Sequence, residues 1–139
     1  MGLKETLLHM VQHKIVFVGR LELDTGILKF LQWLKKNKKY KIDFCGDGNL
    51  KSKCEKCGIV HGFCDPKTYY KKAQICVPGG YLAALEALKY GCQLKLFWDN
   101  PIKKDYWKLS PFVKKDDEQW SKNQTWKNLT NDYLKLWRI

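Results

Sequence analysis

Arginine is scarce in this strongly basic chain of 139 residues. The sequence holds 26 lysines and arginines against 14 aspartates and glutamates, a formal net charge of +12, yet only Arg20 and Arg138 are arginines. A basic chain favours anionic partners such as nucleic acid, lipid headgroups or phosphorylated small molecules. Lysine, however, is also the ordinary cation of solvated surfaces, whereas arginine provides the forked contacts to phosphates and bases. The scarcity therefore weakens the case for nucleic-acid binding and makes Arg20 conspicuous.

The chain also lacks long apolar runs. No stretch approaches the roughly 20 apolar residues of a membrane-spanning helix. Residues 1–14 mix charged residues and histidines with leucines, unlike the continuous apolar segment of a signal peptide. We therefore expect a cytoplasmic location. The lysine-rich stretches 35–41 and 103–108 are expected to be solvated faces, and attraction to the anionic inner face of the membrane is the alternative.

Several familiar signatures are missing. There is no Gly-x4-Gly-Lys-Ser/Thr phosphate loop and no Gly-x-Ser-x-Gly nucleophile turn. The first expected strand ends in Gly19-Arg20-Leu21 instead of Gly-x-Gly-x-x-Gly, which argues against a dinucleotide site.

Short apolar runs alternate with helical patterns along the whole chain. The expected strands are 15–18, 41–44, 59–60, 74–77 and 94–98, and the expected helices are 24–36, 49–57, 66–73, 81–90, a short one after Pro101 and a long one over 116–137. This alternation predicts an α/β, Rossmann-like three-layer domain with a five- or six-stranded parallel sheet. We expect one domain over 1–139, with a core of 13–115 and a C-terminal helix of 116–139.

Two details of the helices are open to test. Asp24 stands where a capping side chain would begin the first helix. Leu82, Leu85 and Leu88 are expected on one side of the helix 81–90, and Gly91 is expected to end it.

Glycine-containing turns follow three of the expected strands, at Gly19, 46–48 and 79–80. Each is explained on its own as a tight turn. In a parallel sheet, however, the carboxyl ends of the strands lie at one edge, where ligands of such folds bind. Together the turns predict a ligand site at that edge.

The residues at these turns form an ordered series. It comprises Val18-Gly19-Arg20-Leu21 with Gly26, Cys45-Gly46-Asp47-Gly48, His61-Gly62-Phe63, Gly80-Tyr81-Leu82-Ala83-Ala84-Leu85-Glu86-Ala87 and Asp99-Asn100-Pro101. In order and spacing the series resembles the C-terminal domain of GT-B-fold, group 1 (glycogen-synthase-like) glycosyltransferases, over residues 15–137. That domain binds the nucleotide-diphosphate sugar donor.

The resemblance implies a role for particular residues. Arg20 would hold the donor diphosphate and act in catalysis, and Glu86 would hold the ribose hydroxyls. A guanidinium matches phosphate oxygens, and glycine-lined helix starts favour anions. The implied substrate-binding residues are Gly19, Arg20, Gly48, Gly79, Gly80, Tyr81 and Glu86. No metal or other cofactor is implied.

The chain departs from the family pattern at two positions. Thr25 stands where a lysine is usual, and Pro78 stands where many members have a glutamate. Lys29, one turn further along, is a candidate replacement for the missing lysine. The resemblance also implies an N-terminal acceptor-binding domain or a separate partner chain, so we do not expect sugar transfer by this chain alone. A non-catalytic nucleotide-binding or interaction domain is the alternative.

A cysteine-rich segment offers a competing interpretation. Cys54, Cys57, His61 and Cys64 have the spacing C-x2-C-x3-H-x2-C, which resembles a zinc knuckle of a single-stranded nucleic-acid-binding protein. The glycosyltransferase pattern also has a histidine near position 61, and Cys57 and Cys64 are equally expected as small buried residues. We favour the interpretation without metal or nucleic acid.

Overall fold

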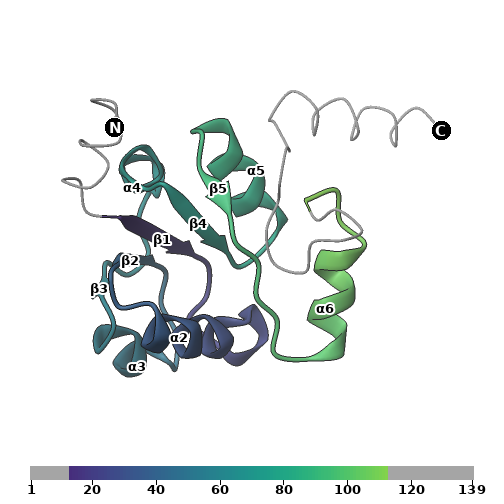
Figure 1. The fold of residues 1–139 in the computed structure, drawn as a ribbon, viewed down its shortest axis with the longest axis horizontal. Coiled ribbons are helices and arrows are strands. Elements are labelled where there is room, and N and C mark those ends of the chain that lie inside the picture. The colour runs from purple at the N-terminus through teal and green to yellow at the C-terminus, as the bar shows by residue number, and fades with distance from the viewer. Residues whose placement is uncertain (1–12, 113–139) are drawn as a thin grey trace, which may run out of the picture.

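The computed structural model describes residues 13–112 (Figure 1). At its centre is a five-stranded, all-parallel sheet in the order β3-β2-β1-β4-β5. The strands are β1 (Lys14–Val18), β2 (Lys41–Cys45), β3 (Ile59–Val60), β4 (Ile75–Pro78) and β5 (Gln93–Leu94). The predicted α/β architecture is confirmed. The expected helix over 116–137, and with it the proposed domain limits, lies outside the described residues.

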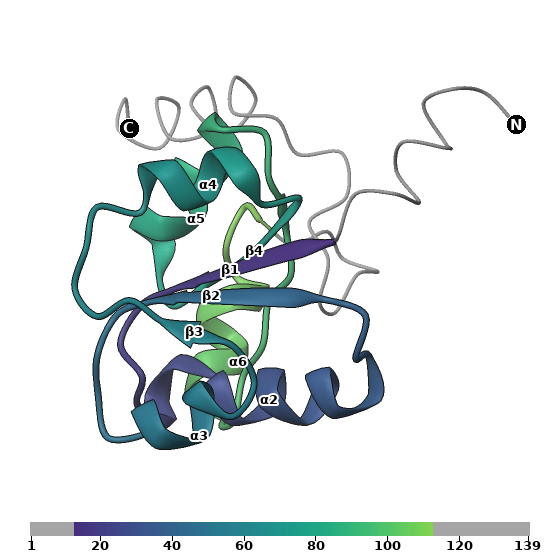
Figure 2. The same ribbon diagram turned by 90° about the vertical axis from the view of Figure 1, so that its left-hand side faces the viewer.

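Helices cover both faces of the sheet. They are the 3-10 turn η1 (Leu23–Thr25), α2 (Ile27–Lys36), α3 (Lys51–Glu55), α4 (Lys67–Lys72), α5 (Tyr81–Lys89) and α6 (Pro101–Lys108). Figure 2 shows α2 and α3 on one face and α4 and α5 on the other, while α6 lies beyond the carboxyl ends of β1 and β4 in Figure 1. Over residues 13–112, no helix has both the length and the hydropathy to cross a bilayer.

The central strand β1 connects two apolar cores. Its side chains alternate between the faces of the sheet. Phe17 packs with Phe30 of α2 on one face, and Val16 packs with Ala84 and Ala87 of α5 on the other, all of them buried. Burial on both faces explains why the sequence of β1 contains a continuous apolar run.

The residues that α5 buries are two of its alanines. Leu82 is 70% exposed, and the fully buried positions are Ala84 and Ala87, with Leu85 and Leu88 only partly buried. Two small residues on the inner face allow the helix to lie close to the sheet. Gly91 does follow the end of α5 with a φ of 83°, as expected of a helix terminator.

Asp24 does not cap α2, contrary to the prediction. It lies in η1, and α2 begins later, at Ile27, after Gly26 with a φ of 79°. Asp24 instead pairs with Arg20. The fifth strand is also shorter than predicted, because pairing with β4 is confined to Gln93 and Leu94.

Among residues 13–112, one lysine lies inside the protein. Lys95, just after β5, is only 2% exposed, and its Nζ lies 4.8 Å from the centre of the Trp33 ring and 5.3 Å from that of Phe97. Burial disfavours the charged ammonium and lowers the pKa of Lys95 from 10.5 to about 8. A group whose folded pKa is lowered binds its proton more weakly in the folded than in the unfolded chain. Lys95 therefore destabilises the fold below pH 8, and this effect disappears as the pH rises from 8 to 10.5.

We expect Lys95→Met to stabilise the protein at pH 7, because the apolar stem remains and the buried charge is lost. The gain should be about 1–3 kcal/mol, the upper figure being the free-energy equivalent of the pKa shift. Urea denaturation under reducing conditions at several pH values measures it. The gain should shrink between pH 8 and 10.5. A pH-independent gain, or an equal gain in the exposed control Lys39→Met, would contradict the assignment.

Candidate donor-binding site

The carboxyl edge of the sheet brings the glycine turns together. Chain connections run to opposite sides of the sheet from β1 and β4, so these neighbouring strands flank the topological switch point where α/β folds bind ligands. The turns after them touch: a Cβ on Gly19 would lie 2.9 Å from the Cα of Gly79. The N–H of Gly79 also donates to the carbonyl of Val18 at 2.8 Å.

The turn after β2 joins the same contact. The N–H of Gly19 donates to Cys45 O at 3.1 Å, and that of Leu21 donates to Asp47 O at 2.9 Å. A Cβ on Gly46 would lie 1.9 Å from Gly19 O, and one on Gly48 would lie 2.5 Å from Leu21 O. The predicted residues Gly19 and Gly48 thus lie where backbone segments approach too closely for a side chain, and a Cβ on Gly79 would fit tightly, 3.0 Å from the Cα of Gly19.

Arg20 projects from this junction into solvent. Its guanidinium forms an exposed ion pair with Asp24, four residues later. Thr25 lies behind it, buried, and its hydroxyl donates to Arg20 O at 3.0 Å and to Glu22 O at 2.8 Å. Thr25 therefore holds the loop that carries Arg20, and its own side chain is turned inward.

A shallow, open hollow of about 430 Å³ adjoins Arg20. It is lined by Arg20, Glu22, Asp47, Gly48, Asn49 and Phe63. Glu22 connects the segment after β1 with the segment after β2 at this hollow, since its Oε1 accepts from the N–H of Asn49 at 3.0 Å. Phe63 presents an 82% exposed ring at this hollow.

The other side of the junction is covered by α6. Tyr81, at the start of α5, is among the implied substrate-binding residues, but in the structure its N–H donates to the hydroxyl of Tyr106 at 3.0 Å. The hydroxyl of Tyr81 donates in turn to Tyr106 O at 2.9 Å, and Lys103 Nζ donates to Gly79 O at 2.7 Å. The turn over Gly79, Gly80 and Tyr81 is at the predicted edge, but α6 already occupies part of its hydrogen-bonding capacity.

Glu86 lies in the second turn of α5 and is half-buried. The hydroxyl of Tyr70 points at its Oε2 across 3.4 Å, a long contact. Burial is the main cause that raises the pKa of Tyr70, and the charge of Glu86 adds to it. Tyr70 thus stays protonated and donates, which leaves the Glu86 carboxylate as an acceptor for hydroxyl groups.

The cysteine-rich segment does not form a cluster. Within residues 13–112, no three histidine, cysteine, aspartate or glutamate side chains gather as metal ligands would. His61 Nε2 pairs with Asp43 Oδ1 at 2.8 Å. The expectation that Cys57 and Cys64 are buried is also wrong: Cys57 is half-buried and Cys64 is exposed, whereas Cys54 is buried.

Sequence reasoning missed the residues that α6 contributes. These are Lys103 and Tyr106, which contact the β4–α5 turn. Asp99, which is part of the ordered series, lies against the start of α2. Burial raises the pKa of Asp99, although the backbone N–H groups of Lys29 and Leu28 act to lower it. In the sequence, only the start of α6 was recognisable, from a capping Asn100 followed by Pro101. In the structure Asn100 Oδ1 accepts from the N–H of Lys103 at 2.8 Å.

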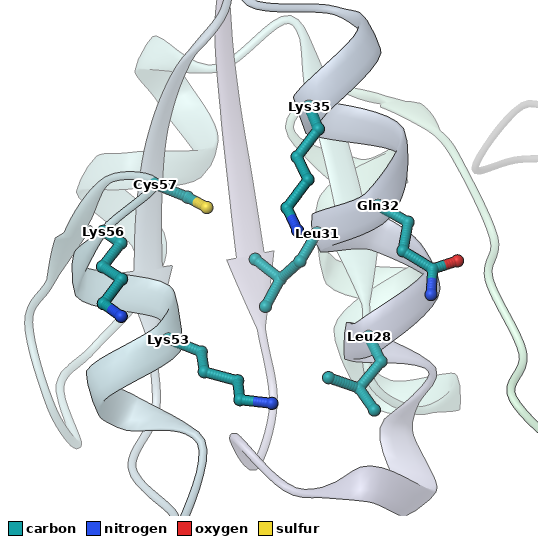
Figure 3. Close-up of a pocket in the computed structure, with 7 residues that line it drawn as sticks. All are labelled: Leu28, Leu31, Gln32, Lys35, Lys53, Lys56 and Cys57. Atoms are coloured by element: carbon teal, nitrogen blue, oxygen red, sulfur yellow. The ribbon is translucent and has the colours of Figure 1, made fainter.

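A second hollow, of about 390 Å³, lies between α2 and α3, away from the junction of the turns (Figure 3). Leu28 and Leu31 of α2 and Lys53 of α3 point into it. Lys35, from the lysine-rich stretch 35–41, is among the residues that line it.

Neither a family model nor a curated protein sequence matches this chain. Solved structures do. The C-terminal domain of the group 1 glycosyl transferase LpcC from Francisella tularensis matches with a TM-score of 0.56 at 16% identity, over 91% of this chain and 76% of that one. The pneumococcal O-GlcNAc transferase GtfA, solved with UDP and GlcNAc, matches with a TM-score of 0.54 at 16% identity, over 86% of this chain and 27% of that one.

A third match shows that this fold is not confined to transferases. A protein assigned as a UDP-N-acetylglucosamine 2-epimerase from Listeria monocytogenes matches with a TM-score of 0.50 at 10% identity, over 96% of this chain and 39% of that one. The chain thus spans well under half of GtfA and of this protein. Its fold is that of the C-terminal half of a GT-B glycosyltransferase, as the resemblance implied.

We expect Gly46→Ala to destabilise the protein severely, by about 3 kcal/mol or more, because its Cβ would collide with the backbone of Gly19. Gly80→Ala is the matched control. Its Cβ would meet only Tyr106 Oη, at 3.5 Å, and its φ of −162° suits any residue, so we expect a change within about 1 kcal/mol. Urea denaturation compares the two. Equal stabilities would show that the turns do not meet as described.

Proposed function

We propose that this chain is the donor-binding half of a glycosyltransferase that transfers a sugar from a nucleotide-diphosphate sugar to an acceptor. One observation carries the proposal: three glycine-lined turns meet at the switch point of a GT-B-type domain, and Arg20 extends from their junction. The fold alone does not choose between transfer and epimerisation. Arg20 and Glu86 stand in the ordered series at the positions for which the glycosyltransferase resemblance implies donor binding, and this supports transfer.

Arg20 would hold the diphosphate. Its guanidinium is exposed and pairs with Asp24, four residues later, an interaction of low net free energy that a doubly charged ligand can replace. The N–H groups at Gly79–Tyr81 would complete the contact. Because a phosphate oxygen is a stronger acceptor than a phenol, it would displace the hydroxyl of Tyr106 from the N–H of Tyr81.

Transfer to an acceptor would require a second domain or partner chain. The match to LpcC is to a C-terminal domain, and the chain spans only 27% of GtfA. A nucleotide-binding domain without transfer activity is the second candidate, favoured by the uncharged Thr25 and Pro78 where the family pattern has charged residues. Sugar transfer on adding the acceptor-binding partner would distinguish the two.

We expect one nucleoside diphosphate in a panel of UDP, GDP and ADP to stabilise the chain, and Arg20→Met to abolish that effect. At about 100 times its dissociation constant a ligand stabilises by about 2.7 kcal/mol, a shift of several degrees in a domain of this size. Thermal-shift assays followed by titration calorimetry measure it. The control is Lys89→Met, at the far end of α5. Undiminished binding by a folded Arg20→Met variant would exclude Arg20 from the site.

We expect Glu86→Gln to weaken binding of that diphosphate by about tenfold, because hydroxyl groups bind a carboxylate more strongly than an amide. The 2′,3′-dideoxy form of the same nucleotide should bind both proteins equally, since it lacks the hydroxyls that Glu86 would hold. Glu55→Gln, on α3, is the control. If the loss were the same for both nucleotides, Glu86 would act on the fold and not on the ribose.

A further inference from the structure

Lys103 reaches from α6 to the junction of the glycine turns. Its Nζ donates to Gly79 O at 2.7 Å and lies 4.3 Å and 5.3 Å from the ring centres of Tyr106 and Trp107. The Lys103 side chain is therefore held in one place, half-buried, at the turn between β4 and α5. An ordinary surface lysine keeps its ammonium in open solvent instead.

The ammonium of Lys103 shares its surroundings with Arg20 and Asp24. Burial is the main cause that lowers the pKa of Lys103, Asp24 raises it, and Arg20 lowers it further. Two cations far apart in sequence, Arg20 on the turn after β1 and Lys103 on α6, therefore lie within electrostatic reach at the switch point. Their mutual repulsion is unfavourable in the absence of an anion, and Asp24 relieves it only in part, at an exposed position.

Lys103 also fixes a peptide of the turn. In a trans peptide the N–H points away from the C=O, so the bond to Gly79 O sets the direction of the N–H of Gly80. The bond to Lys103 thus holds this peptide in place, with the ammonium on the carbonyl side and the N–H of Gly80 on the opposite side.

We propose that Lys103 is the second cation of the diphosphate site and binds the donor phosphates together with Arg20. This inference rests on the proposed function. Thr25 cannot provide the charge, since it is buried and its hydroxyl is bonded to backbone carbonyls. Lys29, the replacement suggested by the sequence, lies exposed on α2, where its charge acts on Asp99. Lys103 supplies the charge from a different element, α6.

The test compares Lys103→Gln with Lys104→Gln, the exposed neighbour on α6, in the full 139-residue chain. Glutamine retains an N–H donor for Gly79 O but no charge. The ligands are uridine, UMP and UDP, or the same series on the base that the panel selects. We expect Lys103→Gln to weaken the binding of UDP by about tenfold, to weaken that of UMP by less and to leave that of uridine unchanged. Lys103→Arg should restore most of the affinity, and Lys104→Gln should match the wild type.

The contrary results are distinct. Equal UDP affinity of wild type and a folded Lys103→Gln variant would overturn the inference while leaving the donor site intact. An equal loss for uridine and UDP would show that Lys103 acts only on the fold, which also overturns it. If the wild-type chain binds none of the three nucleoside diphosphates, the proposed function fails first and this inference fails with it.

Discussion

The close approach of three backbone turns at the end of the sheet is the constraint on which the site depends. Gly46 lies against Gly19, and Gly19 lies against Gly79, at distances that exclude a Cβ. Because backbone fills this junction, the side chains of the turns are directed outward from it. Arg20 therefore reaches solvent, and the start of α5 is presented beside it. The glycines act by their lack of a side chain, and the polar groups derive their positions from that contact.

The sequence was sufficient for the architecture because its signals are local. A continuous apolar run such as β1 is characteristic of a strand buried on both faces, and the alternation with helical patterns implies parallel pairing. Glycines after strands predicted for the same reason which turns meet at the carboxyl edge of the sheet. The expected cap failed because α2 begins only at Ile27, so Asp24 lies in η1 and pairs with Arg20, four residues earlier. On α5, tertiary packing buries Ala84 and Ala87 and leaves Leu82 exposed.

The contribution of α6 was beyond sequence reasoning. Lys103 and Tyr106 lie more than 20 residues from the turn that they contact, within a lysine-rich stretch expected to be a solvated face. Of its lysines, Lys104 fits that description and Lys103 does not, because only the latter is directed at Gly79. Charge composition cannot separate the two, since they are adjacent in sequence and differ only in which side of one helical turn they occupy.

The uncharged residue at position 25 need not mean a weaker anion site. A diphosphate responds to the field at its own position, and that field depends on where the cations lie and not on which segment carries them. Thr25 lacks the charge of the lysine that is usual at this position, but its hydroxyl lies within hydrogen-bonding distance of Arg20 O and Glu22 O and so fixes the Arg20 loop. With Lys103 on α6, the junction has two cations and a loop that Thr25 holds by hydrogen bonding. The sequence motif has one cation fewer than is usual, because position 25 is uncharged. The number of cations around the junction is not reduced, because Lys103 lies there.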